Sequence, residues 1–410
     1  FGSRSDCYLA EGPASPEPAG NMTGIAKGAA REGPDSEKID KAKKAASSRS
    51  RGGNKGRKQT LQYVFWVGGS VGSILVACLI MLLNPDRGPG STPVNDVGLI
   101  AHINRNAKTW SAQPSPMFEG WTINDAKMLE GVGVSSAGGG LSQCQVADAP
   151  VPDDFDLRTR FPQCFSYPIY SMGNCTASWA IAAASALSNR FCMADPATYG
   201  DTMLSPQQLL SCDVKNRGCA GGDVDTVWNF IEQQGLVSEV CFPYEADGSV
   251  PCETESKCKQ DPLKGASHCL LNNEAAIKRE VFLNGPVVAP IFLMNDFLVY
   301  GGGLYQPMQT ASPLSDERRQ RIIHAVKIVG WGVESRKKYW LVENSWGAEW
   351  GEQGYAKVLA TETDKKTGIV VEDYVIAGTP LNKKADEGIE DTEADFEAED
   401  EQMDDIVMTE

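Results

Sequence analysis

The sequence predicts an α+β fold in which a helical part and a β-rich part meet at a cleft, preceded by one transmembrane helix. Helical signals come first in the compact part. In LSPQQLLSC, Ser205 is placed as the N-cap, Pro206 as the first helical residue and Gln208 as the partner in a capping box. Strand-like runs follow later, at residues 325–332, 339–346 and 354–360. Helices followed by strands are typical of α+β proteins.

The transmembrane helix is predicted from residues 61–83, LQYVFWVGGSVGSILVACLIMLL, a long apolar run without a charge. At 1.5 Å per residue this run covers about 34 Å, which is enough to cross a bilayer. The length of the uncharged run disfavours a buried core helix. A cleaved signal peptide is disfavoured because roughly 60 residues precede the run, far more than a short charged leader.

The charges that flank this run predict its orientation. Residues 41–58 are basic and contain no acid, whereas residues 84–97 carry one arginine against two aspartates. The positive-inside bias places residues 1–60 in the cytosol and the later domain on the lumenal or extracellular side, as in a single-pass type II membrane protein. The basic run could also bind nucleic acid. Its place beside the span favours contact with anionic lipid instead, so no nucleic-acid partner is predicted.

Both ends of the chain have the composition of disordered segments. Residues 1–60 are polar and rich in glycine, serine and proline. Residues 385–410 hold thirteen acids and no base, so the rest of the chain accounts for only −3 of the net charge of −16. We expect this acidic tail to be solvated, with a partner-binding role left open.

Cysteine usage indicates an oxidising compartment. Ten of the twelve cysteines lie between Cys144 and Cys269, within a stretch of ordinary globular composition. A zinc site is the competing interpretation, but the chain has three histidines and no paired CxxC units. The sequence therefore predicts disulfides, and neither a metal site nor a cofactor.

A short amphipathic helix is predicted directly after the membrane-proximal residues. Leu99, Ile100, Ile103 and Ala107 recur with helical spacing within residues 97–112. A glycine-rich linker follows at residues 131–140, and the compact unit is expected to occupy residues 150–380.

Five motifs occur in a fixed order: SMGNCTASWAIA at 171–182, GCAGG at 218–222, FLVYGGGLY at 297–305, HAVKIVGWG from 324 and NSWGAEWGEQGY from 344. In this order they resemble the papain family of cysteine proteases, in its cathepsin B-like branch. LIAHINRNAKTWSA, from 99, is similar to a cathepsin B-type propeptide, which in that family lies in the active-site cleft. The resemblance implies the two-subdomain papain-like fold, with residues 97–140 as a pro-segment and linker.

The resemblance also implies a role for each matching residue. Ser178 falls on the nucleophile position and Met172 on the position of the glutamine that donates to the oxyanion. The remaining matches are His324 as the base, Asn344 as the residue that orients it, Trp346 as the shielding indole, and Gly221 and Gly222 as the substrate-binding wall. Cys175 could be considered as a replacement nucleophile, but its pairing with Cys219 by resemblance argues against that role.

Two departures from the family pattern affect catalysis directly. A serine hydroxyl forms no resting ion pair with histidine near neutral pH, and the Met172 thioether has no hydrogen to donate. Losing one oxyanion donor alone typically costs about 10²–10³ in rate. We therefore expect a pseudoprotease with a binding or structural role, whose partners are the membrane, peptide segments in the cleft and its own pro-segment. Two alternatives stay open: an active endopeptidase using Ser178 with His324 and Asn344, or a purely structural lumenal subunit of a membrane complex.

Within the branch, the motifs resemble the non-catalytic group typified by tubulointerstitial nephritis antigen, which also carries serine before this tryptophan. An occluding loop with paired histidines, on which cathepsin B exopeptidase activity depends, has no counterpart in residues 241–258. For the disulfides, the resemblance implies the pairs Cys164–Cys192, Cys175–Cys219 and Cys252–Cys258. Cys269 is left to pair with Cys241 or Cys212, and Cys144 is expected to supply the missing partner, since nine cysteines from Cys164 onward is an odd number.

Overall fold

The computed structural model describes residues 92–133, 141–254, 258–315, 322–360, 370, 372 and 374–381, all within one compact unit, Asp86–Glu410. The predicted cytosolic segment, the apolar run at 61–83 and the acidic tail lie outside these residues. Among the helices of the described part, none has the length and apolar character needed to cross a membrane.

One large sheet organises the unit, with its strands in the order β1-β7-β10-β9-β8-β6-β11-β5 and β3 paired with β8. Its neighbours run antiparallel except for β7 and β10, which are parallel. The bounds are β1 Trp110–Ala112, β3 Phe155–Asp156, β5 Gly265–Leu271, β6 Val287–Phe292, β7 Tyr300–Tyr305, β8 Ile323–Glu334, β9 Lys337–Glu343, β10 Tyr355–Leu359 and β11 Val375–Pro380. A small second sheet pairs β2, Val132–Gly133, with β4, Gly222–Asp223.

The predicted strand runs are confirmed as β8, β9 and β10, with most boundaries within one or two residues of the prediction and one shifted further. β9 ends at Glu343 rather than at residue 346. The chain leaves the strand there because Asn344 turns its Oδ1 back to accept the Ser345 amide at 2.8 Å, while the Asn344 amide donates to the Gly354 carbonyl.

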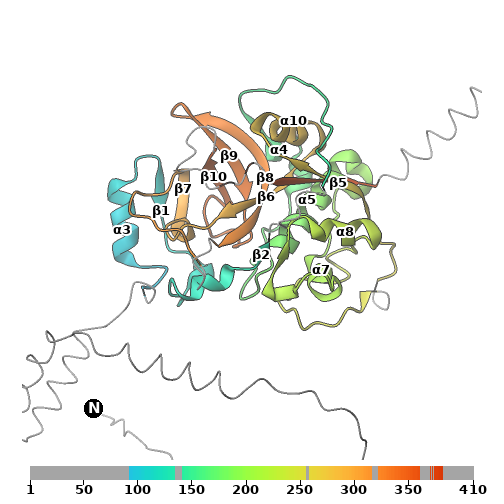
Figure 1. Ribbon diagram of the computed structural model, residues 1–410, viewed down its shortest axis with the longest axis horizontal. Coiled ribbons are helices and arrows are strands. Elements are labelled where there is room, and N and C mark those ends of the chain that lie inside the picture. Colours follow the sequence, from blue (N-terminus) through green and yellow to red (C-terminus); the bar gives the residue numbers. More distant parts are fainter. Residues whose placement is uncertain are drawn as a thin grey trace, which may run out of the picture. The chain divides into compact units, whose positions relative to one another are not determined.

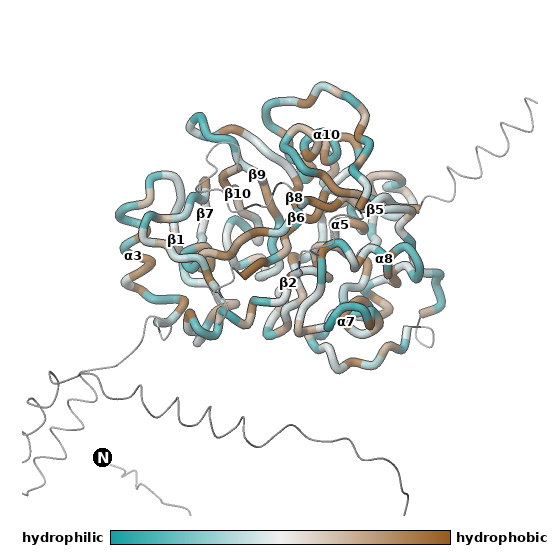
Figure 2. Tube along the Cα trace, viewed as in Figure 1, coloured by the Kyte–Doolittle hydropathy of each residue, from teal (hydrophilic) through white to brown (hydrophobic). Residues whose placement is uncertain are grey.

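Among the helices, the long α5, Ser178–Ala194, is buried and packs against α6, α7 and α8. The others are α3 Val97–Asn106, α4 Leu157–Arg160, α6 Pro196–Tyr199, α7 Pro206–Cys212, α8 Thr226–Gln233 and α10 Glu274–Asn284. Figure 1 shows α3 and β1 beside β7 at one end of the unit, with α7 and α8 at the other end. Apolar residues gather on β6, β8 and α5 between these ends (Figure 2), so the papain-like α+β architecture has its core between the two parts.

The N-terminus of α7 confirms half of the predicted capping box. Ser205 Oγ accepts the Gln208 amide at 3.1 Å, as expected for an N-cap. The Gln208 side chain does not return to the Ser205 amide. It bonds instead the Gly235 carbonyl and the Val237 amide, while the Ser205 amide donates to the Val237 carbonyl. The Gln208 side chain therefore bonds residues distant in sequence instead of the Ser205 amide.

Five disulfides join the described cysteines. Cys164–Cys192 and Cys175–Cys219 are confirmed, but the predicted Cys252–Cys258 bridge is wrong. The observed bridges there are Cys212–Cys252, with Cα atoms 5.0 Å apart, and Cys241–Cys258, at 5.6 Å. Cys252 is therefore bonded to the end of α7 and Cys258 to the turn at Cys241, and the two cysteines are not bonded to each other. Cys269 pairs with Cys144, so the two alternatives considered for Cys269 are also wrong.

Candidate active-site cleft

Ser178 is the first residue of α5 and is completely buried. Its Oγ accepts a hydrogen bond from the Ala325 amide at 3.2 Å. Ala325 follows His324 on β8, so the nucleophile position meets this strand through the backbone. No pattern in the sequence indicates this contact.

His324 lies beside Ser178 and is oriented by Asn344. His324 Nε2 lies 2.8 Å from Asn344 Oδ1, and the imidazole ring lies 4.9 Å from the Trp346 ring. Because Asn344 Oδ1 can only accept, Nε2 carries the hydrogen and the neutral ring keeps its lone pair on Nδ1. That Nδ1 is buried and has no hydrogen-bond partner among the described residues, Ser178 included.

Burial sets the protonation state of His324. It lowers the pKa of His324 to about 4, and the hydrogen bond with Asn344 opposes this shift only in part. The imidazole is therefore neutral near pH 7. The resting cation that an acidified thiolate would need is absent.

This shift predicts acid destabilisation. The pKa of His324 is lower in the folded chain than its ordinary value of 6.5, so its contribution to stability is complete above pH 6.5 and is lost as the pH falls towards 4. Between pH 7.5 and pH 4.5 we expect His324 to account for about 2–3 kcal/mol of lost unfolding free energy. Urea unfolding of the wild type and of His324→Gln at both pH values measures this contribution of His324 to the unfolding free energy. Equal losses in the two proteins would contradict it.

Met172, which the resemblance places at the oxyanion position, is 1 % exposed. Its backbone amide donates to the Ser345 carbonyl at 2.9 Å, and its carbonyl accepts from the Tyr244 hydroxyl at 3.0 Å. The side chain ends in a sulfur that accepts from Ser345 Oγ at 3.7 Å. The backbone is thus held firmly at this position, but its side chain has no donor to offer an oxyanion.

The glycine wall is occupied by the pro-segment. β2 runs parallel to β4, with the Gly222 amide donating to the Gly131 carbonyl at 2.8 Å and the Val224 amide to the Gly133 carbonyl at 3.2 Å. Gly221 has a φ of +109°, and a Cβ there would lie 1.9 Å from the Gly131 oxygen. Only glycine permits this approach of two backbones. The wall that the resemblance assigns to substrate therefore binds a peptide strand of the same chain.

The remainder of the pro-segment docks on the β-rich part. Ile103 of α3 is completely buried, as the amphipathic pattern predicted. β1 pairs antiparallel with β7, and Trp110 within it is 6 % exposed, with its Nε1 donating to the Gln306 carbonyl at 2.9 Å. Trp110 is thus an apolar anchor of this segment, whereas Trp121 is only half-buried.

Phe118 is an anchor that the sequence prediction missed. It is completely buried, and its ring packs edge-on against Trp346 at 5.1 Å and Trp121 at 5.6 Å. The signal was present in MFEGW, where two aromatics stand within a polar segment. Thr176 adds a polar contact, because its Oγ1 donates to the Met128 carbonyl at 2.7 Å.

Removing the Thr176 hydroxyl should loosen this contact. Thr176 is 6 % exposed, so Thr176→Val leaves the Met128 carbonyl without its donor at nearly unchanged shape. We expect a loss of about 1 kcal/mol in pro-segment docking, seen as roughly fivefold faster hydrogen exchange at the Gly222 amide. Thr176→Ser, which keeps the hydroxyl, is the control. Equal exchange in the two variants would contradict this role.

Three features together define the class of protein: an α+β fold, a hydrogen-bonded His324–Asn344 pair beside the N-terminus of α5, and an N-terminal segment paired with the glycine strand β4. The model of the papain family cysteine proteases matches residues 151–377, and the chain belongs to this family.

Curated relatives of the chain include tubulointerstitial nephritis antigen. The chain is 30% identical to the human protein over 294 residues, 64% of this chain and 61% of the relative. It is 30% identical to the protein of Bos taurus over 325 residues, 71% of this chain and 67% of the relative. The chain thus spans about two thirds or less of the length of these relatives.

Solved proforms share the fold. ProCathepsin B S9 from Trypanosoma congolense superposes with a TM-score of 0.61 at 28% identity, covering 71% of this chain and 100% of that chain. Digestive procathepsin L 3 of Tenebrio molitor is similar in fold, with a TM-score of 0.55 at 21% identity. The superposition covers 76% of this chain and 100% of that chain.

Proposed function

We propose that this chain is a membrane-anchored papain-family domain without proteolytic activity, whose cleft binds peptide segments and holds its own pro-segment. One observation carries the proposal. The Ser178 hydroxyl is engaged by the Ala325 amide, while the lone pair of His324 Nδ1 has no partner within the described residues. The group that would attack and the group that would take its proton are not coupled.

Two further features support inactivity. A serine nucleophile depends on proton transfer to histidine during attack, which requires the hydrogen bond that is missing here. Met172 then leaves the resulting oxyanion without a side-chain donor, at a typical cost of about 10²–10³ in rate. Both defects fall on the same step, so they reinforce each other.

The binding role is supported by the backbone pairing at the wall. The Gly222 and Val224 amides already donate to a strand, so the cleft retains the means to hold extended peptide. The placement at a membrane rests on the apolar run 61–83 and its basic flank. Five disulfides support a lumenal or extracellular location for the domain.

An active endopeptidase is the second candidate, and the preserved His324–Asn344 pair favours it. That pair holds the imidazole in the tautomer a general base needs. A small rotation of the Ser178 side chain away from the Ala325 amide is then the step this candidate requires.

Peptide turnover decides between the two candidates. The full chain and a form cut within residues 134–140 of the predicted linker would be incubated with a fluorogenic peptide library, each beside its Ser178→Ala counterpart. The proposal predicts no turnover that depends on Ser178. Turnover by the cut protein that disappears in Ser178→Ala would establish the endopeptidase instead.

A further inference from the structure

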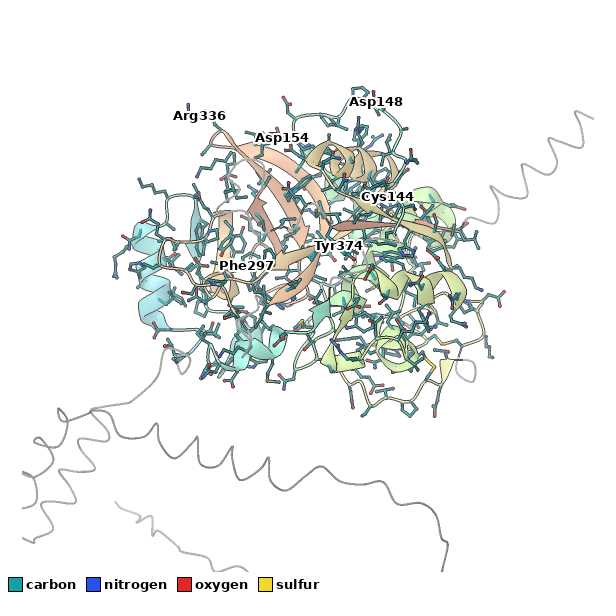
Figure 3. The ribbon with its side chains drawn as sticks, viewed as in Figure 1. Cys144, Asp148, Asp154, Phe297, Arg336 and Tyr374 are labelled. Atoms are coloured by element: carbon teal, nitrogen blue, oxygen red, sulfur yellow. A yellow bond between two sulfur atoms is a disulfide. The ribbon has the colours of Figure 1, made fainter. Side chains whose placement is uncertain are left out.

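The residues that follow the linker are fixed to an edge of the large sheet. β5 is the last strand of that sheet, pairing with β11 on one side. On its other side, the Leu270 amide donates to the Ser142 carbonyl at 2.9 Å and the Cys144 amide to the Leu270 carbonyl at 3.0 Å. Cys144 also forms a disulfide with Cys269 of β5, the Cα atoms lying 4.9 Å apart. Figure 3 shows Cys144 beside β5.

Directly after Cys144, the chain no longer pairs with β5. Residues 145–154 lie along the surface without helix or strand. Within the described part of the chain, the amides of residues 145–151 donate no backbone hydrogen bond. Asp148, whose side chain is 94 % exposed, forms an ion pair with Arg279 of α10 at 2.5 Å, on the loop above α10 in Figure 3. Val146 and Val151 pack against the core, and Pro152 and Asp154 accept hydrogen bonds from β8. Residues 145, 147 and 148 are exposed between these contacts, and exposed backbone without secondary structure is where proteases nick folded chains.

We propose that the Cys144–Cys269 disulfide is a covalent tether that keeps the pro-segment in the cleft after the chain is cut in residues 145–154. Such a cut yields two polypeptides, but the first still ends in residues bonded to β5. The cleft stays covered, and the domain stays joined to everything that precedes Cys144. This inference rests on the proposed function, because it concerns the regulation of the same cleft.

The tether acts through effective concentration. After a cut, a segment held only by non-covalent contacts dissociates into solution at the protein's own concentration. A segment bound through Cys144 rebinds at an effective concentration on the order of 1 mM, the value typical of short flexible links. A competing peptide at 10 µM would therefore occupy the cleft about 100-fold less in the tethered form than in an untethered one.

Release requires a reductant of the dithiol class. One thiolate of the reductant attacks a sulfur of the disulfide and forms a mixed disulfide, and its second thiol resolves this intermediate. Cys144 and Cys269 gain two electrons and two protons as thiols, and the reductant leaves as a disulfide. Their half-buried position makes them more accessible than Cys164 and Cys192, which are completely buried.

The test uses the full chain with the recognition sequence of a site-specific protease inserted between Val146 and Ala147. The matched control carries the same insertion with Cys144→Ser and Cys269→Ser. After cutting, a fluorescent peptide of residues 92–133 is added at 10 µM and its binding is followed by anisotropy. We expect binding by the control and about 100-fold less by the parent, which then gains binding when dithiothreitol is added.

Equal binding by the cut parent and the cut control without reductant would overturn the tether. If the double variant does not fold, the cut parent is titrated with dithiothreitol. Alkylation of Cys144 and Cys269, mapped by mass spectrometry, must then rise together with peptide binding; binding that precedes it would overturn the tether as well. Turnover of the peptide in any arm would count against the proposed function alone, since it does not depend on how the segment is held.

Discussion

Replacing Ser178 by Cys and Met172 by Gln together is expected to raise peptide hydrolysis about 10²–10³-fold above the Ser178→Cys single variant, in protein whose pro-segment has been displaced. The thiol supplies a nucleophile that is more acidic than the serine hydroxyl, at the N-terminus of α5, where the helix dipole favours the anion. The glutamine restores the donor that the Met172 thioether lacks, and the size of the gain is the usual value of one oxyanion donor.

The backbone at Met172 makes this a fair test of the side chain. Its amide and carbonyl bond Ser345 and Tyr244, so the replacement enters a fixed loop rather than a mobile one. Initial rates on a fluorogenic peptide for both variants, with His324→Ala in the double-variant background as the control, measure the effect. If the single variant already matches the double, Met172 is not what limits an oxyanion in this cleft.

Truncating Phe118 is expected to open the cleft. Its ring is completely buried against Trp346, and removing a buried phenylalanine ring typically costs 3–5 kcal/mol, about 10²–10³-fold or more in the population of the opened state. Because Ser178 is completely buried in the closed state, the thiol introduced by Ser178→Cys reports on opening through its alkylation rate.

We therefore expect Phe118→Ala, in the Ser178→Cys background, to be alkylated by iodoacetamide at least 100-fold faster than the background alone. Met128→Ala is the matched control, since Met128 belongs to the same segment but is 56 % exposed. Equal rates in the two variants would show that the segment is not held by the Phe118 contact.

Short motifs carried most of the prediction of the cleft. The helix that begins at Ser178 and the strand that contains His324 are each encoded within a few neighbouring residues, so their local structure could be derived from the sequence. The turn at Asn344, which ends β9 at Glu343, was instead predicted as strand. Contacts between distant segments could not be derived from the sequence. Ser178 and Ala325 are 147 residues apart, and their hydrogen bond depends on how α5 meets β8.

The disulfide error has the same origin. Cys252 and Cys258 are close in sequence, but their observed partners, Cys212 and Cys241, are brought to them by the end of α7 and the turn that follows β4 and α8. Spacing along the chain does not say which loops lie side by side. Phe118 was missed because its importance comes from Trp346, a residue of the other end of the sequence.

The most direct measurement of whether this cleft is catalytic is the reaction of Ser178 with a fluorophosphonate. This small probe modifies a serine that is activated by a histidine base, and it needs no knowledge of substrate preference. Protein whose pro-segment has been displaced would be incubated with the probe, digested and mapped by mass spectrometry, with Ser178→Ala as the blank and an active serine hydrolase as the positive control. Since Ser178 Oγ is bonded to the Ala325 amide and not to His324, we predict no modification at Ser178 above the blank. Stoichiometric modification of Ser178 that is lost in His324→Ala would contradict the proposal and identify an active serine nucleophile.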